Sequence, residues 1–489
     1  MSSNYREQWT SVGGHFPSHW QFFKLEELLE NAKGIAVGVM YPGDHTAEGI
    51  PLIKVGDVKD GYIASQPSFF ISPEVDEEYK RTRLNGTELL ITLVGNPGDC
   101  VVVEPYMAGW NAARALAVVR LKDTGLREWL KYILLSKPAK HLIDARLNTT
   151  VQKTLNLKDI RELGIPIPPK HERDMIIKNI SAIEQKKIVN ADTNQTLEQM
   201  AQALFKSWFV DFEPVKAKMA VLAAGGSQEE ATLAAMTAIS GKDADALAVF
   251  EREHPEQYAE LKATAELFPS AMRESELGEI PEGWYQTLLS ELTGFLNGYA
   301  FKSKDWRETG FPVVKIGSVK PGFVDLKNCS YIDGIGIKNL ERFEVFSGDI
   351  LVGMTGYPGE TGIIPETMQR VYLNQRVGKF TPLFEFLYSY VYTLVRNNNF
   401  KIYVSGQAHG SAQANISSND ILQYPVVKPN DALLRAFDVV VRNLISLKLK
   451  NQAQIQSLEQ LRDTLLPKLL SGEITLPEAE QAVSEVENV

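Results

Sequence analysis

The chain has 489 residues, too many for a single hydrophobic core, so two or more domains are expected. It contains no run of about 18 uncharged apolar residues, and its polar N-terminus lacks the apolar core of a signal peptide, which argues against a membrane protein. The two cysteines, Cys100 and Cys329, lie far apart and exclude a disulfide framework. These features together predict a cytoplasmic globular protein.

The net charge of −10 is distributed unevenly along the chain. Residues 213–283 carry a net charge of −8 and residues 472–489 carry −5, which leaves +3 on the remainder. A weakly basic body permits contact with the phosphates of DNA without requiring it. Composition alone therefore does not identify a partner.

A segment in the first part of the chain recurs 261 residues later. The sequence GIPLIKVGDVKDGYI at 49–63 returns as GFPVVKIGSVKPGFV at 310–324, with seven of fifteen positions identical. At the same offset Gly95 meets Gly356, Gln152 meets Gln413, and the segment 197–199 meets 458–460. One offset that relates several separated windows indicates a tandem duplication.

Each copy predicts a mixed α/β head followed by a long helix. The heads contain short β-patterned runs separated by Gly, Pro and Asn turns, and a helical pattern begins after the prolines that close each head. We divide the chain into a first head (1–170), a first long helix (171–213), an acidic, Ala-rich helical linker (214–283), a second head (284–430), a second long helix (431–476) and an acidic tail (477–489). The linker is either a solvated connector or a docking surface for a partner subunit.

Both long helices carry apolar residues at the alternating spacing of 3 and 4 that is typical of a coiled coil. The two seams are Ile176, Ile180, Ile183, Lys187, Asn190, Asn194, Leu197, Ala201, Leu204, Trp208 and Phe437, Val441, Leu444, Lys448, Asn451, Ile455, Leu458, Arg462, Leu465, Leu469. Because each seam is polar in the middle and apolar at its ends, we expect an antiparallel coiled coil and a pseudo-twofold plan. The alternative is two independent amphipathic helices. A 42-residue helix is ~60 Å long, more than the ~34 Å of one turn of B-DNA, so two heads on such a spacer could meet DNA about a turn apart.

Three motifs carry a resemblance to a known family: ALFKSWFVDFEP at 203–214, SELGEIPEGW at 275–284 and LLPKLLSGEI at 465–474. With the duplicated plan, they make the chain similar to the specificity subunits of type I restriction–modification systems, which act in defence against foreign DNA. The resemblance implies that each head is a target-recognition domain reading one half of a bipartite site in double-stranded DNA, and that the helices set the spacer. It also implies two partner modification subunits that use S-adenosylmethionine, and restriction subunits that use ATP and Mg²⁺. No cofactor is expected on this chain.

We expect no catalytic residue and no metal site in the chain. A phosphate-binding GxxxxGK[ST] loop and zinc-ligand spacing are absent. The Asn96-Pro97-Gly98-Asp99 stretch lacks the second proline and the aromatic residue of an adenine methyltransferase motif, and Tyr357 replaces the asparagine in the second copy. Two alternatives to a DNA-recognition subunit are a self-contained DNA-modifying enzyme and a duplicated protein-interaction scaffold.

Candidate DNA-binding residues fall into three groups. Two lysines of the repeated segment, Lys54 and Lys59, recur as Lys315 and Lys320 and suit either phosphate contact or the fold. Arg114 and Arg376 follow strand patterns in the two heads and suit either DNA contact or an ion pair within the head. The third group has polar side chains that suit base edges, although an ordinary polar loop is an alternative: Arg146, Asn148, Thr149, Thr150, Gln152 and Lys153 in the first copy, and Gln407, His409, Ser411 and Gln413 in the second.

Large apolar residues gather at the ends of the two long helices. They are Phe205, Trp208, Phe209, Phe212, Leu466 and Leu470. Aromatic residues at such places are more often packing or interface residues than stacking platforms for bases, so we expect them near an interface with a modification subunit.

Overall fold

The computed structural model describes residues 2–59, 61–63, 67–147, 153–276, 278–327, 329–356, 358–408, 414–471 and 473. Contacts divide the chain into two compact units: unit 1 is Met1–Lys186 with Ser457–Val489, and unit 2 is Lys187–Gln456. The boundary passes through both long helices, so each unit contains one head and a part of each helix. No helix in the described ranges is long and apolar enough to cross a membrane.

Unit 1 contains the first head and the beginning of the first long helix. Its helices and strands are α1 (Ser2–Thr10), β1 (Gln21–Lys24), α2 (Leu25–Leu28), β2 (Ile35–Val37), β3 (Ile50–Ile53), β4 (Val58–Lys59), β5 (Tyr62–Ile63), β6 (Phe70–Ile71), α3 (Pro73–Glu78), β7 (Leu89–Thr92), β8 (Cys100–Val102), β9 (Asn111–Ala112), β10 (Leu116–Val119), α4 (Arg127–Leu135), α5 (Lys137–Asp144), α6 (Leu157–Arg161), β11 (Gly164–Ile167) and the first part of α7 (Lys170–Phe209). The strands form sheets in the orders β2-β10-β7-β8, β6-β3-β9, β1-β11 and β4-β5. The two central strands β7 and β10 are buried along their whole length, as their unbroken apolar runs require.

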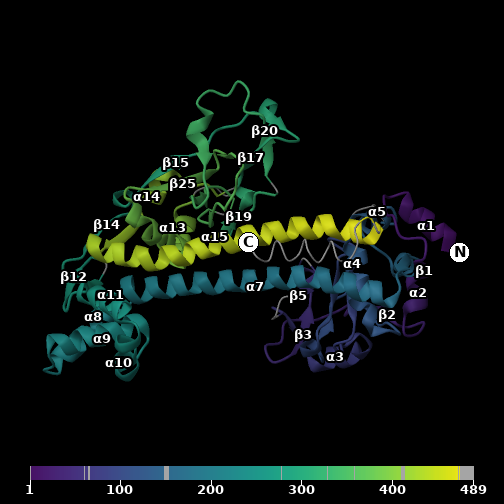
Figure 1. The fold of residues 1–489 in the computed structure, drawn as a ribbon, viewed down its shortest axis with the longest axis horizontal. Helices are drawn as coiled ribbons and strands as arrows, with labels where there is room; N and C mark the ends of the chain where they lie inside the picture. The colour runs from purple at the N-terminus through teal and green to yellow at the C-terminus, as the bar shows by residue number, and fades with distance from the viewer. Residues whose placement is uncertain are drawn as a thin grey trace. The chain divides into compact units, whose positions relative to one another are not determined.

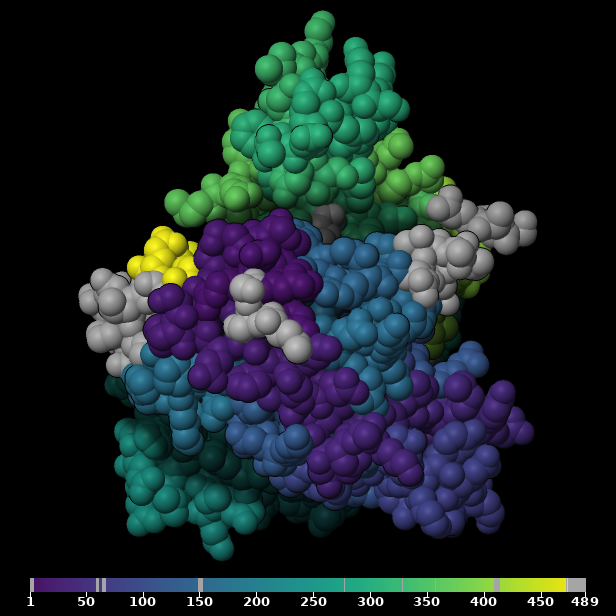
Figure 2. Space-filling model, turned by 90° about the vertical axis from the view of Figure 1, so that its right-hand side faces the viewer, coloured from purple at the N-terminus to yellow at the C-terminus, as the bar shows by residue number. Residues whose placement is uncertain are grey.

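The N-terminal helix α1 packs on the first head. The indole Nε1 of Trp9 donates a hydrogen bond of 2.6 Å to the carbonyl of Gly164 in β11, and Trp9 is buried. The Arg6 guanidinium donates to the carbonyl oxygens of Phe16 at 2.7 Å and Trp20 at 3.0 Å, which closes the loop that follows the helix. In Figure 2 this N-terminal segment, in purple, lies against later residues of the same unit in blue.

Unit 2 contains the linker helices and the second head. Its helices and strands are the last part of α7, α8 (Glu213–Ala223), α9 (Gln228–Ser240), α10 (Ala244–Glu253), α11 (Pro255–Glu266), β12 (Met272–Ser275), β13 (Gly278–Pro281), β14 (Tyr285–Leu288), β15 (Thr293–Asn297), β16 (Trp306–Arg307), β17 (Phe311–Val314), β18 (Val319–Lys320), β19 (Gly322–Val324), β20 (Ser330–Ile332), β21 (Glu344–Val345), β22 (Ile350–Gly353), β23 (Thr361–Ile363), β24 (Val371–Leu373), β25 (Val377–Pro382), α12 (Tyr388–Arg396), α13 (Asn398–Gln407), α14 (Ser418–Leu422), β26 (Pro425–Lys428) and the first part of α15 (Asp431–Ser471).

The second head repeats the strand order of the first. Its largest sheet has the order β15-β25-β22-β23-β19-β18, and the first four strands correspond to β2-β10-β7-β8. Strands β20-β17-β24 repeat β6-β3-β9, and β14-β26 repeats β1-β11. In both heads a parallel pair lies within a mostly antiparallel arrangement, β3 with β9 and β17 with β24. The tandem duplication and the mixed α/β class are therefore confirmed.

The long helices α7 and α15 pair in an antiparallel manner. In unit 2, the helices α7 and α15 lie side by side (Figure 1), and contacts run from Asn190 with Gln454 to Trp208 with Phe437. In unit 1, Glu184 of α7 accepts a hydrogen bond of 2.9 Å from Arg462 of α15. The residue numbers rise on one helix while they fall on the other, which confirms the antiparallel coiled coil and excludes two independent helices.

The middle of the seam is polar and buried, as its sequence predicts. Lys187, Asn190, Asn194 and Lys448 are each less than a tenth exposed. The amide of Asn190 donates to Gln454 at 2.7 Å. Such buried polar pairs fix the relative register of two helices, because a shift would leave polar groups unpaired.

The apolar residues at the helix ends lie in the chain's own cores, and that they lie near an interface with a modification subunit stays a prediction. Phe205, Trp208, Phe209 and Phe212 are buried in unit 2, where Phe268, Trp284 and Phe437 cover them; Leu466 and Leu470 are buried in unit 1. The cover in unit 2 comes from the segment after α11 and from the start of the second head. Phe212 itself has a positive φ of 55°, which turns the chain from α7 into α8.

Candidate nucleic-acid interface

One edge of the first head is built from four chain segments that hydrogen bonding places side by side. Val39 bridges to Ala113, Val94 bridges to Thr154, and the amide of Leu93 donates to the carbonyl of Ala115 at 2.8 Å. The segments 39–41, 112–115, 93–96 and 153–155 therefore lie together. We call this arrangement the first edge.

The first edge brings together two of the sequence-predicted groups. Arg114 and Lys153 both belong to it and both are exposed. No hydrogen bond or ion pair ties Arg114 to another described residue, while the Lys153 Nζ lies 3.9 Å from an Asp144 carboxylate oxygen at the surface. An exposed guanidinium and an exposed ammonium on one edge suit contacts with phosphates and base edges.

The second head has the same edge at the corresponding positions. Tyr299 bridges to Asn374, Thr355 bridges to Asn415, and the amide of Met354 donates to the carbonyl of Arg376 at 3.0 Å. We call this the second edge. It contains Arg376 and also Ala414 and Asn415, which follow the predicted 407–413 stretch.

A hydrogen-bond chain positions Arg376 on the second edge. Its Nη1 donates to the Thr355 hydroxyl at 3.2 Å, and that hydroxyl donates to the Asn415 side-chain oxygen at 2.7 Å. Thr355 is buried, whereas Arg376 and Asn415 are exposed. The guanidinium is thus held in place while donors remain free to bind, and pre-organisation of this kind lowers the entropy lost on contact with a base. Of the two sequence alternatives, an ion pair within the head is not found among the described residues, where the side-chain partner of Arg376 is the Thr355 hydroxyl.

The repeated lysines Lys54 and Lys315 contact aromatic rings in their own heads. The Lys54 Nζ lies 3.5 Å from the centre of the Phe69 ring, and the Lys315 Nζ lies 3.7 Å from the centre of the Trp306 ring. Lys315 also donates to the Ser330 hydroxyl at 2.7 Å. These contacts favour the fold over phosphate binding as the reason for the lysines.

The remaining candidates are placed as follows. Arg146 donates to the Leu142 carbonyl at 2.9 Å and to Gln8 at 3.3 Å, which gives it a role in attaching α5 to α1. Gln407 is exposed at the end of α13, and Lys320 is exposed on β18. Some predicted side chains lie outside the described residues: those of Lys59, Asn148, Thr149, Thr150, Gln152, His409, Ser411 and Gln413.

The sequence analysis missed residues that the fold brings to the edges. Tyr41 is 76% exposed and Met40 is 41% exposed at the first edge, beside the turn between β9 and β10 that carries Arg114. Thr355 and Asn415 complete the second edge. The 261-residue offset aligns Thr355 with Val94 and Asn415 with Thr154, so the sequence shows that these positions correspond in the two heads. That the two positions pair with each other is seen only in the folded structure.

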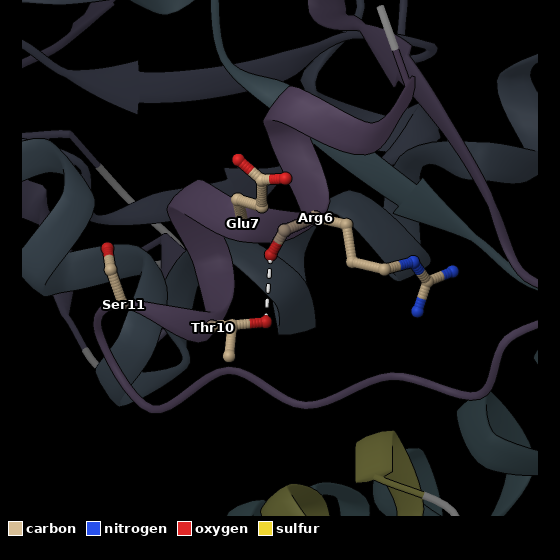
Figure 3. Close-up of a pocket in the computed structure, with 4 residues that line it drawn as sticks. All are labelled: Arg6, Glu7, Thr10 and Ser11. Atoms are coloured by element: carbon tan, nitrogen blue, oxygen red, sulfur yellow. Dashed lines mark hydrogen bonds between the residues drawn. The ribbon is translucent and has the colours of Figure 1, made fainter.

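A shallow hollow of about 510 Å³ lies on α1, lined by Arg6, Glu7, Thr10 and Ser11 (Figure 3). The Thr10 hydroxyl donates to the Arg6 carbonyl at 2.9 Å, and the Ser11 hydroxyl donates to the Gln8 carbonyl at 2.7 Å. Both hydroxyls thus donate to the helix backbone, and no hydrogen bond joins either of them to the Glu7 carboxylate within the described part of the chain. In the described ranges, no group of three or more His, Cys, Asp or Glu side chains is placed to hold a metal ion.

Comparison with known proteins identifies the family. The model of the type I restriction modification DNA specificity domain matches residues 17–199 and again residues 281–455. The chain belongs to the family of type I restriction–modification specificity subunits. Each match contains one whole edge, and together they leave out the linker helices. Family membership gives this specificity subunit the role of DNA recognition.

Individual relatives agree with this family. The specificity subunit of the type I restriction enzyme HindI from Haemophilus influenzae is 30% identical over 361 residues, which are 71% of this chain and 78% of the relative. The specificity subunit of the MjaIX enzyme from Methanocaldococcus jannaschii is 23% identical over 478 residues, which are 95% of this chain and 96% of the relative. A crystal structure of an S subunit from M. genitalium aligns with a TM-score of 0.47 and 15% identity, over 92% of this chain and 96% of that one.

Proposed function

We propose that each head reads one half of a bipartite DNA site through its edge, and that the helix pair sets the number of base pairs between the halves. The observation that carries the proposal is that the same backbone edge recurs in both heads with different side chains. Arg114 corresponds to Gln375, Ala115 to Arg376 and Thr154 to Asn415.

A shared backbone with different side chains suits the reading of different base sequences. Backbone and phosphate contacts position a protein on the duplex, whereas donors and acceptors on side chains distinguish base edges. Arginine pairs best with guanine, and asparagine and glutamine pair best with adenine. The second edge offers all three residue types, while the first offers Arg114 and Lys153.

The helix pair suits a spacer between the two half-sites. Helix α7 has 40 residues and α15 has 41. At ~1.5 Å per residue, each is about 60 Å long, and this exceeds the ~34 Å of one turn of B-DNA. We therefore assign the spacer to these helices, together with docking of the modification subunits.

The proposed subunit is not itself an enzyme. Two modification subunits would methylate adenine with S-adenosylmethionine, and restriction subunits would use ATP and Mg²⁺. This division is supported by the family and by the edges, whose side chains suit binding. The helical linker α8–α11 serves as either a connector or a docking surface, as its sequence suggests.

Single-molecule methylome sequencing tests the proposal directly. Cells that carry this chain with its modification subunit are compared with cells that lack only this chain, and we expect one bipartite methyl-adenine motif to disappear. The variants Arg114→Ala and Arg376→Ala should each relax one base position, in opposite halves of the motif, because a good base contact contributes ~1–3 kcal/mol of discrimination.

Lys33→Ala is the matched control for loss of a positive charge. Lys33 is exposed beside Gly34, which hydrogen-bonds to Arg120, at the end of the sheet opposite the first edge. We expect its methylome to equal that of the wild type. A methylome that does not change when the whole chain is removed would refute the proposed function.

A further inference from the structure

A buried network of polar side chains joins the second head to the helix pair within unit 2. Glu198 lies on α7, Lys448 on α15, and Tyr392 and Arg396 on α12 of the head. The Lys448 Nζ donates to Glu198 at 2.6 Å and to the Tyr392 hydroxyl at 2.9 Å. The Tyr392 hydroxyl donates to Glu198 as well, and the Arg396 Nε donates to its other carboxylate oxygen at 3.0 Å.

The network continues into the sheet of the second head. The Arg396 Nη1 donates to the carbonyl of Thr361 in β23 at 2.9 Å and lies 3.7 Å from the Glu360 carboxylate. Strand β19 passes so close that a Cβ added to Gly322 would lie 3.1 Å from the Lys448 Nζ. Helix α7, helix α15, helix α12 and two strands thus meet at one group of charges.

Because the members of this network are buried, separating them is energetically unfavourable. Tyr392 is completely buried and Lys448 is 9% exposed. Burial alone would raise the pKa of Glu198, but Lys448 and Arg396 hold it below its ordinary value, so the carboxylate is ionised at neutral pH. A buried ion network adds little net stability, yet a rearrangement that separates its members leaves uncompensated buried charge. Its effect is therefore to select one orientation of the head on the helices.

The two α12 residues of this network are replaced by different residues in the first head. At the 261-residue offset, Tyr392 and Arg396 correspond to Lys131 and Leu135, and Lys131 pairs with Glu128 at 2.5 Å. A Cβ on Gly61, the counterpart of Gly322, would meet the methyl group of Leu135 at 3.4 Å.

Other parts of the arrangement are common to both copies. Lys401 pairs with Glu360 at 2.6 Å in the second head, and the corresponding Lys140 lies 3.5 Å from Asp99 in the first. This ion pair is therefore common to both heads, whereas the two residues of α12 that reach Glu198 are not.

We propose that Glu198 is a positioning residue that fixes the second head on the helix pair and thereby restricts the spacer length that the complex accepts. The inference rests on the proposed function, in which the helices set the spacer. A shift of the second head along or around the helices would move its half-site, so an intact network permits one spacing. Glu198 acts through Tyr392 and Arg396 and touches no DNA.

The test is the spacer length of the methylated motif in cells that carry the chain with its modification subunit. Glu198→Gln removes the charge that all three partners share. Arg396→Leu introduces the residue of the first head and leaves Glu198 paired with Lys448, so it provides a second variant should the first fail to fold. Arg370→Gln is the control, because it removes an exposed ion pair with Glu344 in the same head that shares no residue with the network.

The measured quantity is the ratio of methylation at motifs whose spacer is one base pair longer or shorter to methylation at motifs with the native spacer. We expect this ratio to be roughly tenfold higher in both test variants than in wild type, which corresponds to about 1.4 kcal/mol. The bases of both half-sites should stay unchanged, and Arg370→Gln should match wild type. A general loss of folding lowers methylation of every motif and does not change this ratio.

Two results would overturn the proposal: both test variants keep the native spacer alone, or Arg370→Gln relaxes the spacer as much as they do. A wild-type methylome without any bipartite motif would refute the proposed function instead. This result is distinguishable from failure of the Glu198 proposal because it is seen in the wild type, without any variant.

Discussion

Trp208 provides the sharpest test of the packing at the end of α7. Its side chain is 1% exposed, and its ring centre lies 5.2 Å from that of Phe268, 5.5 Å from that of Phe437 and 6.0 Å from that of Phe209. The partners come from α7 itself, from the segment after α11 and from α15. Replacement by alanine would therefore open a cavity where three segments of unit 2 meet.

The expected magnitude follows from the type of side chain and its burial. A buried tryptophan or phenylalanine replaced by alanine typically costs about 3–5 kcal/mol in unfolding free energy, through lost transfer energy and the cavity left behind. The indole Nε1 has no hydrogen-bond partner in the described part of the chain, so no hydrogen bond adds to this cost. Against a total stability of about 5–15 kcal/mol for a domain, the loss is large.

Urea denaturation followed by far-ultraviolet circular dichroism measures this cost. We expect Trp208→Ala to lower the midpoint strongly, while Val439→Ala, which alters a side chain 67% exposed on α15, should change the free energy of unfolding by less than about 0.5 kcal/mol. A Trp208→Ala protein with wild-type stability that no longer binds its modification subunit would refute the packing argument, and Trp208 would then be an interface residue.

Two further predictions concern the lysine contacts and the buried tyrosines. Lys315→Met removes the contact with Trp306, so we expect a stability loss of about 0.5–1 kcal/mol in thermal denaturation and an unchanged salt dependence of DNA binding; a fall of about 1 in the slope of log affinity against log salt would instead assign Lys315 to a phosphate. Burial raises the pKa of Tyr388 and Tyr390, so both hydroxyls stay neutral in the fold at a pH where the unfolded chain ionises. Their stabilising effect is complete below the unfolded pKa of about 10 and is lost as the pH rises towards the folded pKa. Ultraviolet titration should show them ionising together with the loss of circular dichroism, and ionisation near pH 10 in a folded protein would contradict this.

The sequence predicted what periodicity and repetition can encode. The 261-residue offset aligns the strands of the two heads, and every position of the two coiled-coil seams that is apolar at a helix end lies buried or partly buried in the structure. Seam positions are predictable because a helix repeats its facing side every 3 to 4 residues, whichever partner covers it. The polar centre of the helix pair was predicted as well, because Lys187 and Asn190 recur at the same spacing as Lys448 and Asn451 in the second copy.

Contacts between distant segments were beyond this reasoning. The side chains of Phe209 and Phe212 look like an exposed aromatic cluster in the sequence, and only the return of the chain through Phe268 and Trp284 covers them. Arg376 likewise gains its partner Thr355, and through it Asn415, from two segments outside its own turn. A local sequence pattern does not indicate which distant segment of the chain covers a given surface.

The lysine contacts show how the two heads have diverged around one backbone. At the 261-residue offset, Trp306 corresponds to His45 and Ser330 corresponds to Phe69. In each head, one of these two positions supplies the aromatic ring that the lysine contacts. In the second head it is the first position, Trp306, and in the first head it is the second position, Phe69. The contact is kept while its residues are exchanged. Compensation of this kind preserves the strand that leads to each edge, and it leaves the side chains of the edge, such as Arg114 and Gln375, free to differ. A duplicated chain that must read two unlike half-sites requires this separation between a constant frame and variable readers.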